Sequence, residues 1–254
     1  MTGQGAARRP VLGILGGLGP AASVDFYAKL VAATPAAGDQ DHLHLVLLSD
    51  PRVPDRNAGV AGTGPSPGPG LADMARRLEL AGAEVLFMVC NTAHAFADEV
   101  RRAVAAPLVS IVDEAVAATL TAAPGAAAVG VLAAAGAQDA RLYPTAFAAR
   151  GVTVLEPTGA DRAAFMALLY RVKGGDTGPD VRAGMLALAR TLVDAGAEAL
   201  VAGCTEVPLV LARGDLAAAG LEVPLVASTD ALVAAAVAIG TGIRPVPPPL
   251  RAGA

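Results

Sequence analysis

The most constraining feature of this chain is that its second half repeats its first. A ten-residue block, AGAEVLFMVC, ends at Cys90, and AGAEALVAGC ends at Cys204; six positions are identical at a spacing of 114 residues. Residues 107–109 recur as 224–226, and residues 11–15 find a weaker echo at 129–132, both at a spacing of 117. Chance similarity in an Ala-rich chain is the alternative, but three blocks in one order indicate two similar halves. We place the halves at residues 1–121, carrying Cys90, and 122–254, carrying Cys204.

Each half has the alternation of short apolar runs and helical stretches that is typical of an α/β fold. Runs that are apolar at every position indicate strands buried on both faces, as in parallel sheets. The expected strands are residues 11–15, 44–48, 85–89, 128–132, 152–155 and 199–202. The expected helices are residues 26–32, 71–81, 95–105, 143–149, 182–194 and 232–239. We therefore predict two pseudo-symmetric halves, each with a mainly parallel sheet flanked by helices, and an active site in the cleft between them. Residues 59–70, rich in Gly and Pro, are expected to be a flexible loop and a candidate lid.

Composition argues against several classes of partner. The net charge is -4 and only 3% of residues are aromatic, which argues against nucleic acid. A charge-free stretch between Glu114 and Asp139 is long enough to span a membrane, but Pro124-Gly125 interrupts it and it is built of Ala, Thr and Gly, so no membrane span is expected. Arg8-Arg9 mimics an export signal, but the apolar run behind it is short and broken by Gly. A cytoplasmic location with reduced thiols follows as an expectation.

The two cysteines are the main candidates for chemistry. Each ends a strand-like run and precedes a helical stretch, where helix N–H groups favour a thiolate and lower its pKa. If the halves face each other, the two sulfurs face one ligand from opposite sides. One alternative is that both are buried core residues. Another is a zinc site assembled from Cys90, Cys204, His42, His44 and His94, but no Cys-x-x-Cys or His-x-x-x-His pair supports it, and no metal is expected.

The glycine-rich loop after the first expected strand suggests an anion-binding turn. Gly17-x-Gly19-x-x-Ala22 fits a dinucleotide-binding fingerprint, but no acidic residue ends the second strand at the required distance. We interpret the loop as a close backbone approach to a small anionic ligand, with a nucleotide-dependent dehydrogenase as the alternative. No cofactor is expected.

Two cations have the spacing of the repeat. Arg56 and Lys173 lie 117 residues apart, and Lys173 is one of only two lysines in the chain. Two cations in equivalent positions suit a ligand with two carboxylates. The alternative for each is an ordinary solvated surface charge.

These motifs together resemble the aspartate/glutamate racemase family, and most closely its aspartate racemase branch. The likeness rests on residues 12–20 (LGILGGLGP), 54–56 (PDR), 90–94 (CNTAH) and 203–206 (GCTE), with Val172-Lys173-x-Gly between them. It runs in order from about residue 11 to residue 238. The resemblance implies a homodimer that works without pyridoxal phosphate. It also implies that the final helix packs back on the first half, so that the C-terminus crosses the boundary near residue 121.

The resemblance also implies roles for individual residues. Cys90 and Cys204 are the two expected catalytic bases. The residues expected to bind the amino acid are Leu18, Arg56, Asn91, Thr92, Lys173 and Thr205. The chain departs from the family at Ala134 and Ala137, where Thr is usual, and at Ala227, where Asp is usual.

The expected reaction is therefore racemisation of a small amino acid, aspartate or glutamate, by proton transfer between two cysteines. One thiolate removes the α proton while the opposing thiol donates a proton to the other face. Two alternatives stay open. One is a related reaction on the same scaffold, such as hydantoin racemisation, maleate isomerisation or arylmalonate decarboxylation. The other is a catalytically silent homologue that binds a dicarboxylate.

Overall fold

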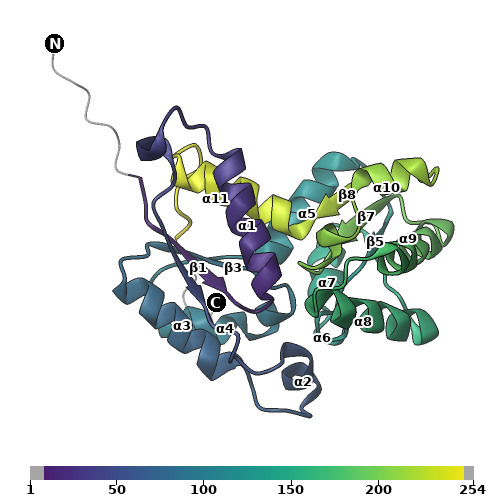
Figure 1. The fold of residues 1–254 in the computed structure, drawn as a ribbon, viewed down its shortest axis with the longest axis horizontal. Coiled ribbons are helices and arrows are strands. Elements are labelled where there is room, and N and C mark those ends of the chain that lie inside the picture. Colours follow the sequence, from purple (N-terminus) through teal and green to yellow (C-terminus); the bar gives the residue numbers. More distant parts are fainter. Residues whose placement is uncertain (1–8, 249–254) are drawn as a thin grey trace.

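The computed structural model describes residues 9–248 and contains two α/β halves side by side (Figure 1). The first half contains β1 (Leu12–Gly16), α1 (Pro20–Ala33), β2 (Leu45–Ser49), α2 (Arg56–Ala61), α3 (Gly68–Leu80), β3 (Val85–Met88), α4 (Ala97–Ala103), β4 (Leu108–Val109) and α5 (Ile111–Ala122). The second contains β5 (Ala128–Val131), α6 (Ala135–Asp139), α7 (Leu142–Ala148), β6 (Thr153–Leu155), α8 (Gly159–Lys173), α9 (Pro179–Asp194), β7 (Ala199–Ala202), α10 (Arg213–Ala218), β8 (Leu225–Ala227) and α11 (Ser228–Gly240).

The two sheets confirm the predicted architecture. Each has four strands that are parallel throughout, in the orders β2-β1-β3-β4 and β6-β5-β7-β8. The first strand of each half therefore occupies the same central place, and its two neighbours correspond as well. Every carboxyl end of a strand lies at one edge of its sheet, which is where ligands of parallel sheets bind.

Two glycines show the repeat at atomic level. Gly13 on β1 pairs with Leu86, and Gly130 on β5 pairs with Leu200. A Cβ on Gly13 would lie 2.7 Å from the Leu86 side chain, and one on Gly130 would lie 2.7 Å from that of Leu200. At both places the missing side chain lets a helix, α3 or α9, pack closely on the sheet.

We expect Gly13→Ala and Gly130→Ala to destabilise the protein by similar amounts, about 1–3 kcal/mol each, because both overpack equivalent sites. Denaturant unfolding followed by circular dichroism measures the effect. Gly214→Ala in α10 is the matched control, since a Cβ there meets no atom within 4 Å. A large difference between Gly13→Ala and Gly130→Ala would contradict the structural equivalence of the halves.

A shared apolar core joins the halves. It contains Ile14 and Phe87 from the first sheet and Val131 and Val201 from the second, together with side chains of α5 and α11. Two further cores lie on the other faces of the sheets, beneath α3 and beneath α8 and α9. The halves are thus held face to face by buried apolar surface, the main favourable contribution to folding.

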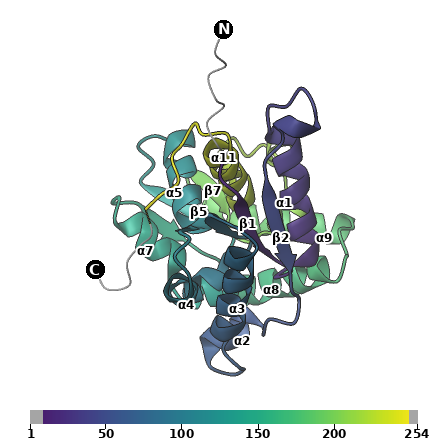
Figure 2. The ribbon, with the colours of Figure 1, turned by 90° about the vertical axis from the view of Figure 1, so that its left-hand side faces the viewer.

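The last helix lies between α1 and α5 (Figures 1 and 2) and contacts both. Its residues Ser228–Gly240 are mostly Ala and Val and are buried around most of the circumference. A helix that is apolar on all sides is typical of a buried position. The C-terminal segment therefore packs on the first half as well as on its own.

Several local expectations were wrong. The short strands β4 and β8, of two and three residues, were not predicted, nor were α2, α5, α6, α8 and α10. The segment 59–70 is not a continuous loop, because α2 ends at Ala61 and α3 begins at Gly68. The charge-free stretch between Glu114 and Asp139 forms most of α5, then β5 and α6. Within residues 9–248, no helix has the length and apolar character needed to cross a bilayer. Arg8 lies outside the described residues.

Candidate active site

The two cysteines follow equivalent strands. Cys90 comes after β3 and Cys204 after β7, and both strands are the third in the order of their sheet. The sulfurs therefore belong to the carboxyl ends of corresponding strands, next to the loop that follows β1. The helical stretch after Cys90 starts with a 3-10 turn, Thr92–Phe96, and continues as α4, whereas Cys204 is followed only by the short 3-10 turn Val207–Leu209. Short turns of this kind do not supply the aligned N–H groups of an α-helix end.

Cys204 is buried, with 7% of its surface exposed, and its pKa is raised well above the usual value. Burial is the largest cause, and the negative charge of Glu206 adds to it. The predicted lowering of this thiol pKa is thus overturned. Cys90 is partly exposed.

Glu206 is a buried carboxylate that sequence reasoning quoted in a motif but did not assign to the site. Its Oε2 accepts hydrogen bonds from the Cys204 thiol at 3.0 Å and from the Thr205 hydroxyl at 3.1 Å. Its Oε1 accepts from the ammonium of Lys173. Burial raises the pKa of Glu206. The charge of Lys173 and these hydrogen bonds lower it by more than burial raises it, so the pKa lies below its ordinary value. An acidic residue two positions after Cys204, in an otherwise apolar run, was the available signal.

Lys173 interacts electrostatically with both cysteines. Its burial lowers its pKa, but Glu206, Cys204 and Cys90 all act to raise it, and the net direction is upward. Cys90 from the first half and Cys204 from the second thus both favour the charged form of Lys173.

A cavity of about 160 Å³ lies at this junction. Three of the expected residues line it, Leu18, Arg56 and Lys173, together with Glu206 and the loop 17–21. Neither cysteine is among its lining residues. Cys204 is instead connected to it through Glu206, whose carboxylate forms part of the wall. A space this size suits only a small ligand, since drug-sized pockets are roughly 300–1,000 Å³.

Arg56 also supports the loop after β1. Its guanidinium donates to the carbonyl oxygens of Leu18 at 2.6 Å and of Val53 and Pro54 at 3.1 Å each. It begins α2, whereas Lys173 ends α8. Each of these helices follows the second strand of its half, and the two cations line one cavity from opposite helix ends.

The remaining expected residues are buried at the junction of the halves. Asn91 accepts a hydrogen bond from the Tyr143 hydroxyl at 2.6 Å and donates to Ser228 at 3.0 Å. Its side chain thus ties the Cys90 turn to α7 and α11. Thr92 lies against Gly136 of α6, close enough that a Cβ there would be 2.7 Å from its methyl group. Thr205 donates to Glu206.

His94 fixes the backbone around Cys90. Its Nδ1 lies 2.8 Å from the Cys90 carbonyl oxygen, and its Nε2 accepts from the Ile111 N–H at 3.2 Å. Nδ1 therefore carries the proton and the imidazole is neutral. Burial lowers the pKa of His94 to about 4. His94 thus orients the Cys90 turn and is not available as a base.

We expect the free energy of unfolding to fall as pH drops from about 6.5 to about 4, because the unfolded chain binds a proton that buried His94 excludes. The loss has an upper bound of about 3.5 kcal/mol, from roughly 1.4 kcal/mol per pKa unit. In His94→Ala this part of the pH dependence should disappear. Denaturant titrations across this pH range measure it, and equal slopes for both proteins would contradict the assignment.

The three departures from the family differ in their surroundings. Ala134 and Ala137 are almost fully buried at the start of α6. Ala227 precedes α11 as its N-cap and supplies no capping side chain. An Asp there could accept from the free N–H groups of α11.

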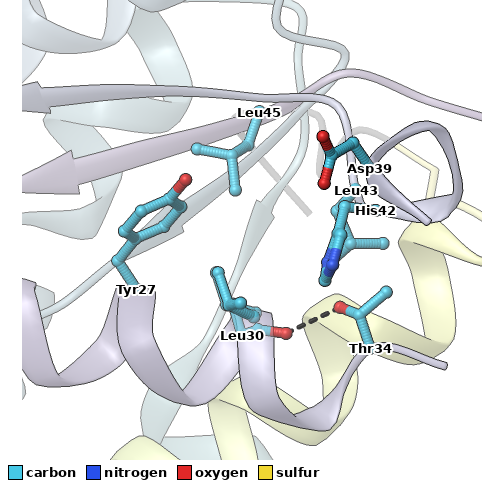
Figure 3. A pocket seen from close by; sticks show the side chains of 8 residues that line it. Tyr27, Leu30, Thr34, Asp39, His42, Leu43 and Leu45 are labelled. Atoms are coloured by element: carbon cyan, nitrogen blue, oxygen red, sulfur yellow. Dashed lines mark hydrogen bonds between the residues drawn. The ribbon is translucent and has the colours of Figure 1, made fainter. Parts of the chain in front are cut away.

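A second cavity, of about 280 Å³, lies away from the cleft (Figure 3). Tyr27, Leu30 and Thr34 of α1 and its end face Asp39, His42 and Leu45 across it. It contains neither cysteine nor any expected substrate residue, so it is separate from the candidate site. The described residues contain no group of three or more His, Cys, Asp or Glu side chains suited to a metal ion.

Comparison with known proteins identifies the family of this chain and finds solved structures with the same fold. The family model for Asp/Glu/Hydantoin racemase matches residues 15–236. The solved aspartate racemase of Picrophilus torridus is 26% identical, with a TM-score of 0.76 over 92% of this chain and 94% of that one. The glutamate racemase isoform RacE1 of Bacillus anthracis is 16% identical, with a TM-score of 0.69 over 93% and 84%, and shows the fold alone.

A curated relative adds a further similarity. The broad specificity amino-acid racemase RacX of Bacillus subtilis is 29% identical over 110 residues. That match spans 41% of this chain and 47% of the relative, so the chain matches about half of its length.

Proposed function

Because the chain belongs to the Asp/Glu/Hydantoin racemase family, we propose that it is an amino-acid racemase that acts without pyridoxal phosphate and transfers the α proton between Cys90 and Cys204. The observation that carries this proposal is the placement of both thiols at corresponding strand ends within the electrostatic reach of one lysine. The pseudo-symmetric halves, divided near residues 121 and 122, supply one thiol each.

The mechanism follows from the needs of a carbanion without an electron sink. The Cys90 thiolate takes the α proton from one face, and the Cys204 thiol delivers a proton to the other. The reverse direction exchanges their roles. The negative charge that develops on the substrate carboxylate needs fixed donors, for which we propose Lys173, Thr205 and the N–H groups near Leu18 and Thr92. Asn91 holds the Cys90 turn against the second half.

We propose aspartate or glutamate as substrate, since the two cations Arg56 and Lys173 line one small cavity. Arg56 donates to three carbonyl oxygens, so its most direct effect is to shape the loop at Leu18. The aspartate and glutamate racemases among the similar structures, and the broad-specificity relative, define the panel to be tested.

The test is turnover of a panel of D- and L-amino acids, followed by circular dichroism without added cofactor. We expect aspartate or glutamate to lose its optical activity fastest. Tight binding of aspartate with no loss of optical activity would instead favour a silent binding homologue. Turnover of hydantoins, maleate or arylmalonates alone would favour a related reaction on the same scaffold.

We also propose that the protein is a homodimer. Val24, Tyr27 and Val31 lie on one face of α1, and 70%, 47% and 43% of their surfaces are exposed. An exposed apolar stripe of this kind is typical of an interaction surface. Light scattering should give twice the 25.0 kDa mass of one chain, and Tyr27→Asp should restore the monomer. A monomeric mass for the unaltered protein would exclude this assembly.

A further inference from the structure

The carboxylate of Glu206 is enclosed by donors and by the opposite half. Only 3% of the residue is exposed. Oε1 is bound to Lys173 and Oε2 to the thiol of Cys204 and the hydroxyl of Thr205. A Cβ on Gly19 would overlap Oε1, so the loop after β1 closes directly over the carboxylate.

In the hydrogen bond between Cys204 and Glu206, the sulfur is the donor and the carboxylate is the acceptor. A thiol donates its proton to a carboxylate, whereas a thiolate at Cys204 would place a second negative charge 3.0 Å from Oε2. Like charges this close disfavour ionisation. Two groups favour the thiolate of Cys204, the ammonium of Lys173 from α8 and the backbone N–H of Glu206, but burial and the Glu206 carboxylate outweigh them, and the net direction of the pKa is upward. The ammonium of Lys173 is already paired with Oε1 of the same carboxylate.

Cys90 has different surroundings. It is partly exposed, and its thiol makes no hydrogen bond among the described residues. His94 binds the Cys90 carbonyl oxygen instead of the sulfur. No carboxylate is therefore seen to hold a proton on Cys90 in the part of the chain that the structure describes, and the two sulfurs are chemically unequal.

We propose that Glu206 is a positioning residue that holds Cys204 as the neutral thiol in the resting enzyme, the form that accepts the enantiomer whose α proton faces Cys90; the opposite enantiomer is turned over by the form that carries the proton on Cys90. This inference rests on the proposed two-thiol function. The Cys90 thiolate forms an S–H bond as the α C–H bond breaks and leaves its electron pair on carbon. The S–H bond of Cys204 then breaks as a C–H bond forms on the opposite face. Cys204 is left as a thiolate, and solvent returns a proton to it while accepting one from Cys90.

The experiment titrates Cys204 alone. Cys90→Ser leaves Cys204 as the only thiol, and the pH dependence of alkylation by iodoacetamide gives its midpoint without substrate. Adding Glu206→Gln keeps the size of the side chain but removes the charge and offers an amide donor to the sulfur. We expect the midpoint to fall by about one pH unit or more. Glu222→Gln, at an exposed glutamate, is the matched control and should leave the midpoint unchanged.

An unchanged or higher midpoint in the Glu206→Gln protein would overturn the inference. The midpoint, unlike the absolute rate, does not depend on how easily the reagent reaches a buried sulfur. If Cys90→Ser does not fold, the same titration is read on the intact protein by locating the alkylated cysteine with mass spectrometry. There Cys204 should be modified at higher pH in the wild type than in the Glu206→Gln protein, and the reverse order would refute the proposal.

The outcome is separable from that of the proposed function. Failure of the unaltered protein to racemise any amino acid would remove the function, while the substrate-free titration would still decide the protonation state of Cys204. Conversely, racemisation with an unchanged Cys204 midpoint would keep the function and remove the role of Glu206.

Discussion

Replacing either Cys90 or Cys204 by alanine is expected to lower kcat/KM by about 10²–10⁴-fold, the usual contribution of a positioned acid or base. Each face of the α carbon has one proton carrier, so loss of either interrupts inversion in both directions. The double variant should be little worse than either single one, because residues that act as a unit are not additive. Racemisation of aspartate and glutamate followed by circular dichroism measures the effect.

Thermal unfolding is the control for these variants, since Cys204 is buried and part of an apolar core. Cys90→Ala should melt close to the wild type. A single-cysteine variant that racemises at the wild-type rate would show that one sulfur is dispensable, and the two-thiol mechanism would fail.

Replacing Lys173 by methionine is expected to damage both stability and activity. It leaves the carboxylate of Glu206 buried without its ammonium partner, and removing one member of a buried pair costs about 3–5 kcal/mol. Because the Lys173 side chain is 26% exposed, we expect the lower end, about 3 kcal/mol, or a fall in Tm of roughly 6–12 °C. Activity should fall by about 10²–10³-fold, as a cation at the developing charge is lost.

The stability lost in Lys173→Met should depend on pH, because Lys173 determines the pKa of Glu206. In the wild type the pKa of Glu206 is lowered, so its contribution to stability is present above the ordinary value of about 4.5 and is lost as pH falls. Without Lys173 that pKa rises, and the deficit of the variant should grow as pH increases. The double variant Lys173→Met with Glu206→Gln removes both charges and should recover most of the stability but not the activity. A Lys173→Met protein as stable as the wild type at pH 8 would contradict this account of the pair.

The sequence was most informative where the two halves constrain each other. The blocks ending at Cys90 and Cys204 predicted two sheets of the same kind, and the strands that carry them are indeed equivalent. Continuous apolar runs such as residues 85–89 were recognisable because parallel strands buried on both faces need no polar positions. The resemblance to the racemase family singled out Leu18, Arg56 and Lys173 as substrate-binding residues, and all three line one cavity.

Elements without a clear apolar period were missed. α5 is rich in Ala and Val, so its sequence does not mark one face, and its position depends on contacts with α11 and with the second half. β4 and β8 are too short for a pattern, although residues 107–109 and 224–226 were visible as a repeat. The pKa of Cys204 was misjudged because its direction depends on burial and on Glu206, which only the three-dimensional structure brings into contact with the sulfur.

The most direct test of two sulfurs acting on opposite faces of one carbon is racemisation in D₂O followed by NMR of the α position. Starting from one enantiomer of the best substrate, the account predicts that the first product molecules carry deuterium while the unreacted substrate keeps its proton. The removed proton stays on one thiol, and the new atom comes from the other, which has equilibrated with solvent. Racemised product that carries the original proton and no deuterium at the α carbon would contradict the account.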